Sequence, residues 1–379
     1  MARFGTAIRA RRVSVTRVAL LCPYALSVYG GVQEQVLAMA RTLDRRGLEV
    51  MIVAPDSSDR ANHGTNVRIE RFGHLLSIPA NGSRAPVTVS WAAARAAQRA
   101  IAQFAPQIVH LHEPFAPIFG YQVLRTHAVA SVATFHRAGG GPAYSLTRPV
   151  LMRFARGIDC ATAVSALAAE TIYAGAAIDS MILFNGFETE RLREYARVTS
   201  AVSQILFLGR LEVRKGARTF LDAARLANVQ HPQWHFVVAG EGPEGPQLRR
   251  EFAELRNVEF RGAVSDDQKR TLLRHANVLV APATHGESFG LVLLEAMAAE
   301  TAVVASDIDG YRAAAGGHAT LFSPRDPLDL VRAIQSALVV SSEQISEARR
   351  HAENWSMESL MDRYSEIYEQ ALSRFVAPQ

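Results

Sequence analysis

Short strand-like runs of aliphatic and β-branched residues alternate with helical patterns along most of the chain. The first run is Arg17 to Leu21, and a helical pattern from Val32 to Arg46 separates it from the run Glu49 to Ala54. Strands that alternate with helices are joined by βαβ crossovers, which build a mainly parallel sheet with helices on both faces. An α/β fold is therefore predicted, with further strands at residues 67–72, 107–111, 130–135, 158–164 and 181–184 and a helix at 89–104.

A polar segment at residues 188–200 has no strand pattern, and the alternation restarts after it, with strands at 204–208, 234–239, 258–260, 278–281 and 301–305 and helices from Ala217 and Leu291. The restart indicates a second doubly wound domain, and a length of 379 residues suits two to three domains. Such sheets bind ligands at the carboxyl ends of their strands, so a cleft between two facing domains is expected. We predict a loose Arg-rich extension at 1–15, domains at 16–190 and 191–354, and a C-terminal helix at 355–379 that packs back on the first domain.

The composition excludes global disorder and a disulfide-built fold. Hydrophobic residues make up 49% of the chain and charged residues 20%, so it can bury sizeable cores. The two cysteines, Cys22 and Cys160, form neither a disulfide framework nor a zinc-ligand spacing. Arg11-Arg12 precede an apolar run that stops at Pro23, too short for an export signal, and no stretch approaches the ~18 apolar residues of a membrane span. A cytoplasmic protein is expected.

The net charge of +5 is unevenly distributed along the chain. Up to Glu190 there are 19 basic and 12 acidic residues, a balance of +7, and beyond it 22 basic and 24 acidic residues give −2. A basic half indicates an anionic partner or surface for that half. Arg95 and Arg99, one helical turn apart and near Arg84 in the sequence, either bind an anionic lipid surface or form an ordinary solvated face.

Three glycine-rich segments have more than one interpretation. Gly30-Gly31 precedes the first helix and suits either an anion at the helix N-terminus or a tight turn. Residues 240–245 match G-x-G-x-x-G, which keeps an oxidoreductase open, although Pro243 and a position after the second strand of its domain favour a turn. Residues 286–290 match the hydrolase motif G-x-S-x-G, with Asp326 and His351 as candidate partners, but the preceding strand ends well before Ser288.

Charged residues follow two strands of the second half. Glu287 and Glu295 stand eight residues apart around a helix start, where the free amides of residues 288–291 suit an anion and the carboxylates suit sugar or ribose hydroxyls. Arg210 and Lys215, one of only two lysines in the chain, follow the first strand of this half. A guanidinium and an ammonium could neutralise a leaving diphosphate, or the segment is a solvated charged loop.

Three histidines lie at strand ends in the first half. His110 and His112 share one face of a strand, and we expect them to face the cleft, because no third metal ligand is evident. His136 closes the next strand and is also expected to point into the cleft, as a structural or a catalytic residue.

Together these segments resemble the GT-B retaining glycosyltransferases of family four, from about Arg17 to Ala371. The matching pieces are GGVQ, HLHEP, ATFH, NGF, FLGR with RKG, GEGP and ESFGLVLLEAMAAETAVVASD. Within the family, the segments CPYALSVYGGVQ, IPANGS, HLHEPFAP and ESFG are similar to actinobacterial phosphatidylinositol mannosyltransferases.

The resemblance implies two Rossmann-like domains that face each other across a cleft, with the acceptor on the first and the nucleotide sugar on the second. It implies transfer of a hexose, mannose from GDP-mannose, to a phosphatidylinositol-type lipid, with retention and with no metal or cofactor. It also implies peripheral binding to the inner face of the cell membrane and no nucleic-acid partner. A UDP-sugar transferase with a soluble or polyprenyl-linked acceptor is the alternative; an oxidoreductase, an α/β-hydrolase or a non-catalytic binder of sugar nucleotides are others.

The site residues follow from the same resemblance. Arg210 and Lys215 would bind the diphosphate, Glu295 the ribose, Glu287 the sugar hydroxyls, and His136 would lie beside the reacting sugar. The other implied donor contacts are Gly31, Ser288, Phe289, Gly290 and Leu291, and the implied acceptor contacts are Tyr24, Gln33, Asn81, Ser83 and Arg137. The chain departs from the pattern at Ser27, where an acidic residue is expected, and at 137–141, where Arg-Ala-Gly-Gly-Gly replaces a threonine and a later lysine. The loop from Arg210 to Lys215 is one residue shorter than in the inositol-lipid enzymes.

Overall fold

The computed structural model describes residues 15–27, 30–55, 65–80, 83–116, 119–136, 142–193, 202–285, 287 and 290–376. At 77–80, 83–86, 142–147 and 193 the description covers the backbone alone. The chain divides into two compact units, one made of residues 1–184 and 360–379 and the other of residues 185–359. The sequence had suggested divisions at 190/191 and 354/355, and all but one residue of the suggested N-terminal extension lies outside the described ranges.

The first unit is built on a parallel seven-stranded sheet in the order β3-β2-β1-β6-β7-β8-β9. Its strands are β1 (Arg17–Leu21), β2 (Glu49–Pro55), β3 (Arg68–Phe72), β6 (Ile108–His112), β7 (Ala130–Phe135), β8 (Cys160–Ala163) and β9 (Met181–Ile182). Its helices are α1 (Gly31–Arg45), α2 (Trp91–Phe104), α3 (Phe119–Thr126), α4 (Pro142–Ala155) and α5 (Ala166–Ala176). The crossover order reverses between β1 and β6, which is where ligands of doubly wound sheets bind.

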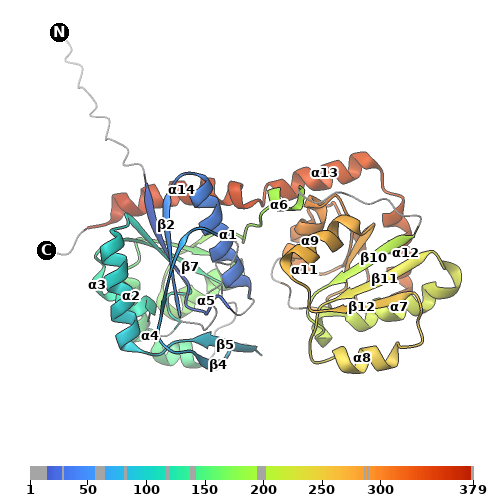
Figure 1. Ribbon diagram of the computed structural model, residues 1–379, viewed down its shortest axis with the longest axis horizontal. Coiled ribbons are helices and arrows are strands. Elements are labelled where there is room, and N and C mark those ends of the chain that lie inside the picture. The colour runs from blue at the N-terminus through green and yellow to red at the C-terminus, as the bar shows by residue number, and fades with distance from the viewer. Residues whose placement is uncertain are drawn as a thin grey trace, which may run out of the picture. The chain divides into compact units, whose positions relative to one another are not determined.

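The two faces of the first sheet carry different side chains. Alternate residues of β1, β2, β6, β7 and β8 form one apolar core with α2, α3 and α5. Figure 1 shows α2 and α3 together on one side of this sheet, away from α1. On the opposite face, β6, β7 and β8 present His110, His112, Thr134 and Thr162, and these polar side chains are almost completely buried.

The second unit contains a parallel six-stranded sheet in the order β12-β11-β10-β13-β14-β15. Its strands are β10 (Ser203–Leu208), β11 (Trp234–Ala239), β12 (Val258–Gly262), β13 (Val278–Ala281), β14 (Ala302–Ser306) and β15 (Thr320–Phe322). Its helices are α6 (Glu190–Arg193), the 3-10 turn η1 (Val213–Lys215), α7 (Ala217–Gln230), α8 (Gly245–Glu251), α9 (Asp266–His275), α10 (Leu291–Ala298), α11 (Asp309–Ala315), α12 (Pro327–Leu338) and α13 (Ser342–Glu353). The predicted α/β class with parallel sheets is confirmed in both units.

The last helix, α14 (Met357–Arg374), begins in the second unit and continues into the first. Tyr364 and Tyr368 are completely buried against the polar face of the first sheet. Asp362, in the second turn of α14, pairs with Arg46 at 2.9 Å, and Arg374 at its C-terminal end donates to the carbonyl of Asp159. These contacts fasten α14 to the first unit.

A small antiparallel hairpin, β4 (Leu76–Ala80) with β5 (Ser83–Val87), stands apart from both sheets and was not predicted. Figure 1 shows it at the bottom of the first unit. Each strand contains a proline, Pro79 and Pro86, which argues against a strand in the interior of a sheet. A two-stranded ribbon tolerates them, because each strand has a free edge at which a missing N–H costs no ladder bond.

Candidate active site

Two loops meet at the carboxyl edge of the second sheet. Strands β10 and β13 are parallel neighbours, so the segments that follow them emerge side by side. The Thr284 N–H donates to the carbonyl of Arg214 at 2.8 Å and joins the two loops directly. Gly216 makes this approach possible: its φ is +73°, and an added Cβ would lie 1.9 Å from the carbonyl oxygen of Pro282.

The joined loops carry one continuous network of charged side chains. Glu287 Oε1 lies 2.6 Å from Lys215 Nζ and 2.7 Å from Arg214 Nη1. Arg214 also reaches Glu212 at 3.3 Å, and Glu212 in turn pairs with Arg210 at 2.9 Å. The network contains three basic and two acidic side chains and therefore has an excess of one positive charge. Of the site residues predicted in this unit, Arg210, Lys215 and Glu287 are thus brought together.

Glu295 belongs to a second, separate ion pair. It projects from α10, and its Oε1 lies 2.9 Å from Nζ of Lys269 on α9. Both side chains are mostly buried, with 18% and 19% of their surface exposed, so the pair is shielded from solvent. Each lysine of the chain is therefore paired with one of the two glutamates that stand eight residues apart.

The start of α10 offers backbone donors near Glu287. The N-cap residue is Gly290, which provides no side-chain acceptor for the first amides of the helix, including that of Leu291. Gly290 has a φ of +82°, and an added Cβ would lie 2.6 Å from the Tyr311 ring. Burial, and secondly the charge of Glu287, raises the pKa of Tyr311 and keeps its hydroxyl neutral. Ser288 and Phe289, predicted as donor contacts, lie outside the described residues.

The glycine-rich turn at 240–245 packs against protein backbone. Gly240 has a φ of +142°, and an added Cβ would meet the carbonyl oxygen of Gly209 at 1.9 Å. Leu211 donates to Glu241 O and accepts from Glu244 N, both at 3.0 Å, so the turn holds the loop that carries Arg210. This packing explains the glycines without a dinucleotide and weakens the oxidoreductase interpretation.

The candidate hydrolase partners have structural roles. Asp326 caps α12 by accepting from the amides of Leu328 and Asp329 at 3.0 Å. His351 Nε2 bonds to the carbonyl of Ala314 at 2.8 Å. Strand β13 ends at Ala281, seven positions before Ser288 in the sequence, whereas the nucleophile of an elbow directly follows its strand.

In the first unit, the buried side chain of Gln33 stabilises the turn that follows β1. The N-cap of α1 is Gly30, and its added Cβ would lie 2.5 Å from Oε1 of Gln33. Gln33 is only 5% exposed and donates to Ala25 O at 3.4 Å, close in sequence to Tyr24, which is partly buried. Gly31 is exposed, with open space where a Cβ would stand. Of the remaining predicted acceptor contacts, Asn81 and Arg137 lie outside the described residues, and of Ser83 only the backbone is described.

His136 follows β7 and is bound to two residues of the neighbouring strand end. Its Nε2 lies 3.0 Å from Nδ1 of His112, and its backbone N–H donates to the Glu113 carboxylate. Glu113 has a φ of +45° and is 5% exposed, so the chain turns sharply there and directs the carboxylate back toward β7.

His110 and His112 do not face a cleft, contrary to the sequence-based expectation. Both are 0% exposed, and their rings stack with centroids 4.6 Å apart. His110 Nε2 contacts Thr134 Oγ1 at 2.7 Å, and its Nδ1 contacts the Tyr368 hydroxyl at 2.9 Å. His110 is covered by α14, whose Tyr368 hydroxyl pairs with it. His112 lies between the rings of His110 and His136 and stacks on both.

The histidines of this cluster are neutral at physiological pH. Burial lowers the pKa of His136 to about 4 and, with the nearby His136, that of His110 to about 3. Burial and the two neighbouring imidazoles also lower the pKa of His112 well below its usual value. Among the described residues, no group of three or more His, Cys, Asp or Glu side chains could hold a metal ion.

The exposed face of α2 combines an aromatic and two basic side chains. Trp91 is 51% exposed, and Arg95 and Arg99 follow it at intervals of four residues on the same face. The opposite face carries small apolar residues, such as Ala97, that pack in the core. The described part of the chain contains no helix long and apolar enough to cross a membrane.

Sequence reasoning missed several residues of these networks. Arg214 and Glu212 lie within the predicted basic loop, and only the contact with Glu287 distinguishes Arg214 from a solvated arginine. The scarcity of lysine was the available signal for Lys269. Nothing in the sequence indicated that Tyr368 reaches His110 and that Tyr364 reaches Thr134, because the partners in each pair are more than 200 residues apart.

Comparison with known proteins gives consistent matches over nearly the whole chain. Residues 29–191 match the model "Glycosyltransferase Family 4", and residues 202–339 match "Glycosyl transferases group 1". A phosphatidyl-myo-inositol mannosyltransferase of Mycobacterium tuberculosis H37Rv is 36% identical over 324 residues, which are 83% of this chain and 84% of that protein. A glycogen synthase of the same organism is 30% identical over 62% of this chain and 60% of its own.

Among solved structures, a glycosyltransferase from Rickettsia africae superposes with a TM-score of 0.73 at 17% identity, covering 94% of this chain and 99% of that one. At this identity the similarity establishes the two-domain GT-B fold. The family models and the mycobacterial relatives then fix the assignment: the chain belongs to family 4 of the glycosyltransferases and is an enzyme that transfers a sugar.

Proposed function

We propose that this enzyme transfers mannose from GDP-mannose to a phosphatidylinositol-type lipid. The observation that carries the proposal is the charged network of Arg210, Arg214, Lys215 and Glu287, at the joined ends of β10 and β13. It stands in a chain that is 36% identical to a protein named phosphatidyl-myo-inositol mannosyltransferase.

The donor binds to the second unit. Arg210 and Lys215 take the diphosphate, and the excess positive charge of their network favours an anion there. Glu287 accepts from sugar hydroxyls, and Glu295 accepts from the ribose while Lys269 holds its carboxylate in place. The uncapped amides at the start of α10 add backbone donors for phosphate and sugar.

The transfer proceeds with retention and needs no metal. The bond between the anomeric carbon and the diphosphate oxygen breaks, and a bond from the same carbon to an acceptor hydroxyl oxygen forms on the same face of the sugar. The hydroxyl proton passes to the leaving phosphate, so no protein nucleophile is required. Arg210 and Lys215 stabilise the charge that develops on the diphosphate, which is electrostatic stabilisation by preorganised cations.

The acceptor reaches the first unit from a membrane surface. Trp91, Arg95 and Arg99 form one exposed stripe of α2, in which an interfacial aromatic stands beside two cations. Each basic residue near an anionic surface contributes about 1 kcal/mol, and a tryptophan adds a headgroup-level anchor. This combination supports reversible peripheral binding at the inner face of the membrane.

A donor panel tests the activity. Purified protein is incubated with GDP-mannose, UDP-glucose, UDP-GlcNAc or NAD, each with vesicles that contain phosphatidylinositol, and the products are read by mass spectrometry. A lipid heavier by one hexose with GDP-mannose alone is the expected result, and it persists in EDTA. Transfer from another donor, or loss of transfer in EDTA, contradicts the corresponding part of the proposal.

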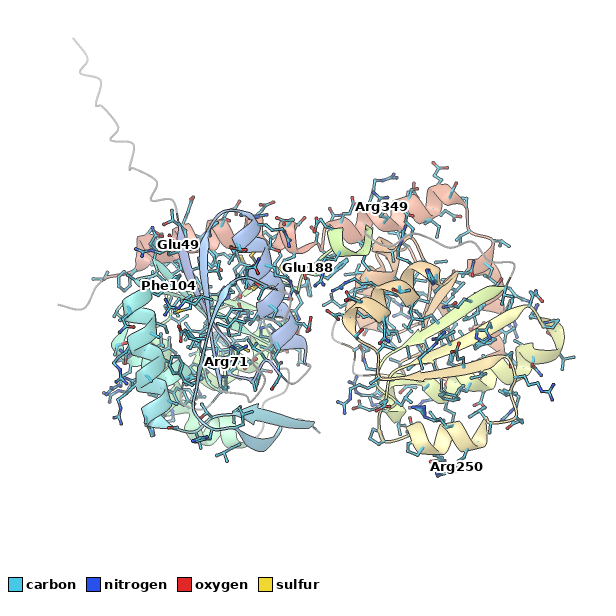
Figure 2. All side chains as sticks on the ribbon, in the orientation of Figure 1. Glu49, Arg71, Phe104, Glu188, Arg250 and Arg349 are labelled. Atoms are coloured by element: carbon cyan, nitrogen blue, oxygen red, sulfur yellow. The ribbon has the colours of Figure 1, made fainter. Side chains whose placement is uncertain are left out.

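Two substitutions test the donor assignment against a matched control. Arg210→Ala and Lys215→Ala should each lower turnover about 100-fold, since each removes a cation from the leaving group. Arg250→Ala removes an arginine that is exposed on α8, away from the network, and should have little effect (Figure 2). Full activity in both site variants refutes the diphosphate assignment.

Membrane binding is tested by vesicle co-sedimentation. The wild-type protein should bind phosphatidylinositol vesicles and dissociate as salt rises, and Arg95→Glu with Arg99→Glu should bind weakly. Vesicle binding that does not change with the salt concentration or with the lipid charge would contradict docking through α2.

A second candidate function is transfer from a UDP-sugar to a soluble or polyprenyl-linked acceptor. The similarity to glycogen synthase over 62% of the chain supports it. In the same panel it predicts UDP-sugar consumption that does not depend on inositol lipid.

A further inference from the structure

Within the histidine cluster of His110, His112 and His136, the contact between His112 and His136 joins a fully buried imidazole to one that is partly exposed. His112 is 0% exposed, whereas His136 is only partly buried. The two rings meet through Nδ1 of His112 and Nε2 of His136, 3.0 Å apart. The other nitrogen of His112, Nε2, is buried and has no hydrogen-bond partner in the described structure.

This contact contains a single proton. Burial keeps both imidazoles uncharged, so each ring carries one N–H and one lone pair. A hydrogen bond between two nitrogens needs the proton on one and the lone pair on the other. Either His112 donates through Nδ1–H, or His136 donates through Nε2–H.

The unpartnered nitrogen of His112 decides between the two arrangements. If His136 donated, the single proton of His112 would have to sit on Nε2, where it would be a buried N–H without an acceptor. Orphaned buried N–H groups are rarer in folded proteins than acceptors with an unused lone pair. If His112 donates instead, its Nε2 buries only a lone pair.

We propose that His112 is a positioning residue that holds His136 in its Nδ1–H tautomer. Because Nε2 of His136 accepts from His112, the single proton of His136 resides on Nδ1, for which the described residues offer no partner. His136 therefore presents an N–H toward its surroundings and acts as a hydrogen-bond donor. Its buried lone pair is occupied, so it does not act as a general base.

The role of this N–H at the sugar rests on the proposed function. An Nδ1–H beside the reacting sugar can donate to a hydroxyl of the sugar or to an oxygen on which negative charge develops. Such a role suits the proposed transfer, in which the proton of the acceptor hydroxyl passes to the leaving phosphate and no protein base is needed.

The tautomer itself is measured without any substrate. In protein labelled with ¹⁵N-histidine, long-range proton–nitrogen correlation spectra distinguish Nδ1–H from Nε2–H rings, and the His136→Gln and His112→Asn variants identify the signals by their disappearance. We expect both His112 and His136 as neutral Nδ1–H rings. An Nε2–H ring at His136 overturns the proposal, whatever the activity of the enzyme proves to be.

Two substitutions at His112 connect the tautomer to turnover. In His112→Asp a carboxylate acceptor faces Nε2 of His136, which should convert the ring to Nε2–H and lower kcat about 100-fold with little change in KM. In His112→Asn the amide N–H replaces the lost Nδ1–H, so the Nδ1–H signal of His136 should remain and most of the turnover lost in His112→Asp should return. Equal losses in both variants while His136 keeps its Nδ1–H overturn the positioning role. If circular dichroism shows that either variant does not fold, the proton–nitrogen correlation spectrum of the wild-type protein still distinguishes the two tautomers of His136.

Discussion

Glu287 competes with an incoming diphosphate for the same cations, and Glu287→Gln exposes this competition. One carboxylate oxygen of Glu287 lies 2.6 Å from Lys215 and 2.7 Å from Arg214. A phosphate oxygen that bound Lys215 from its other side would lie roughly 5 Å from the carboxylate, if contact distances of about 3 Å apply. The glutamate therefore repels the diphosphate while it orders the lysine.

The size of the effect follows from Coulomb's law. Two unit charges about 5 Å apart interact by about 1 kcal/mol in water-like surroundings and about 3 kcal/mol at an effective dielectric constant near 20. Lys215 and Arg214 are 23% and 38% exposed, so the low end applies. With about two charges on the diphosphate, the glutamine variant should bind it about 2 kcal/mol, or roughly 30-fold, more tightly at low salt.

The assay combines calorimetry with turnover. Glu287→Gln should bind GDP and inorganic pyrophosphate more tightly than the wild type, with a gain that shrinks in high salt, yet transfer mannose far more slowly, because the sugar loses its carboxylate partner. Glu254→Gln, which changes an exposed glutamate elsewhere in the same unit, is the matched control. Unchanged or weaker pyrophosphate binding by Glu287→Gln would refute the reasoning.

Three other expectations concern the framework of the site. Thr134→Val keeps the shape but leaves His110 Nε2 without its partner at 2.7 Å, which should cost about 2 kcal/mol and speed hydrogen exchange in β6–β8 while β10–β14 stay protected. The pKa values of His110 and His136 are about 3 and about 4 in the folded protein, whereas histidines of the unfolded chain titrate near pH 6.5. Between these values the folded protein therefore binds fewer protons than the unfolded chain. The free energy of unfolding should therefore be fully present above pH 6.5 and fall as the pH drops toward 4; a denaturation midpoint that is flat over this range speaks against neutral histidines. Gly216→Ala places a Cβ 1.9 Å from Pro282 O, so it should lower the melting temperature of the second unit and weaken donor binding. In the control Gly31→Ala the added Cβ meets no atom within 4 Å, and this variant should melt like the wild type. Equal melting temperatures for the two variants would contradict this account.

The sequence predicted the framework well because the responsible signals are local. Short apolar runs that alternate with helical patterns predicted both parallel sheets, and the resemblance to family four implied that Arg210, Lys215 and Glu287 belong to one donor site. The hairpin β4–β5 was not predicted because Pro79 and Pro86 disfavour a strand in the interior of a sheet. The sequence does not show that each strand of this hairpin has a free edge, at which proline is tolerated.

The histidine cluster was misread because its environment is not local. A polar residue at the end of a strand suggests an exposed ligand, and only the docking of α14 turns His110 into a buried residue with two hydroxyl partners. The pairing of Lys269 with Glu295 likewise depends on how α9 and α10 pack, which no spacing rule gives. Tertiary contacts, rather than propensities, account for what could not be predicted.

The route of α14 sets the order in which this protein can be completed during synthesis. Thr134 and Tyr364 share a hydrogen bond although 230 residues separate them, and the whole second unit lies between them. At about 10 residues per second the ribosome needs roughly 20 seconds to supply the tyrosine after the threonine. During that interval His110, Thr134 and Thr162 of the nascent first sheet lack the tyrosine hydroxyls that pair with them, while the second unit, contiguous in the chain, has all its strands. The first unit is therefore the first to be synthesised and the last to be completed, because its polar sheet face is covered only when helix α14 has been made.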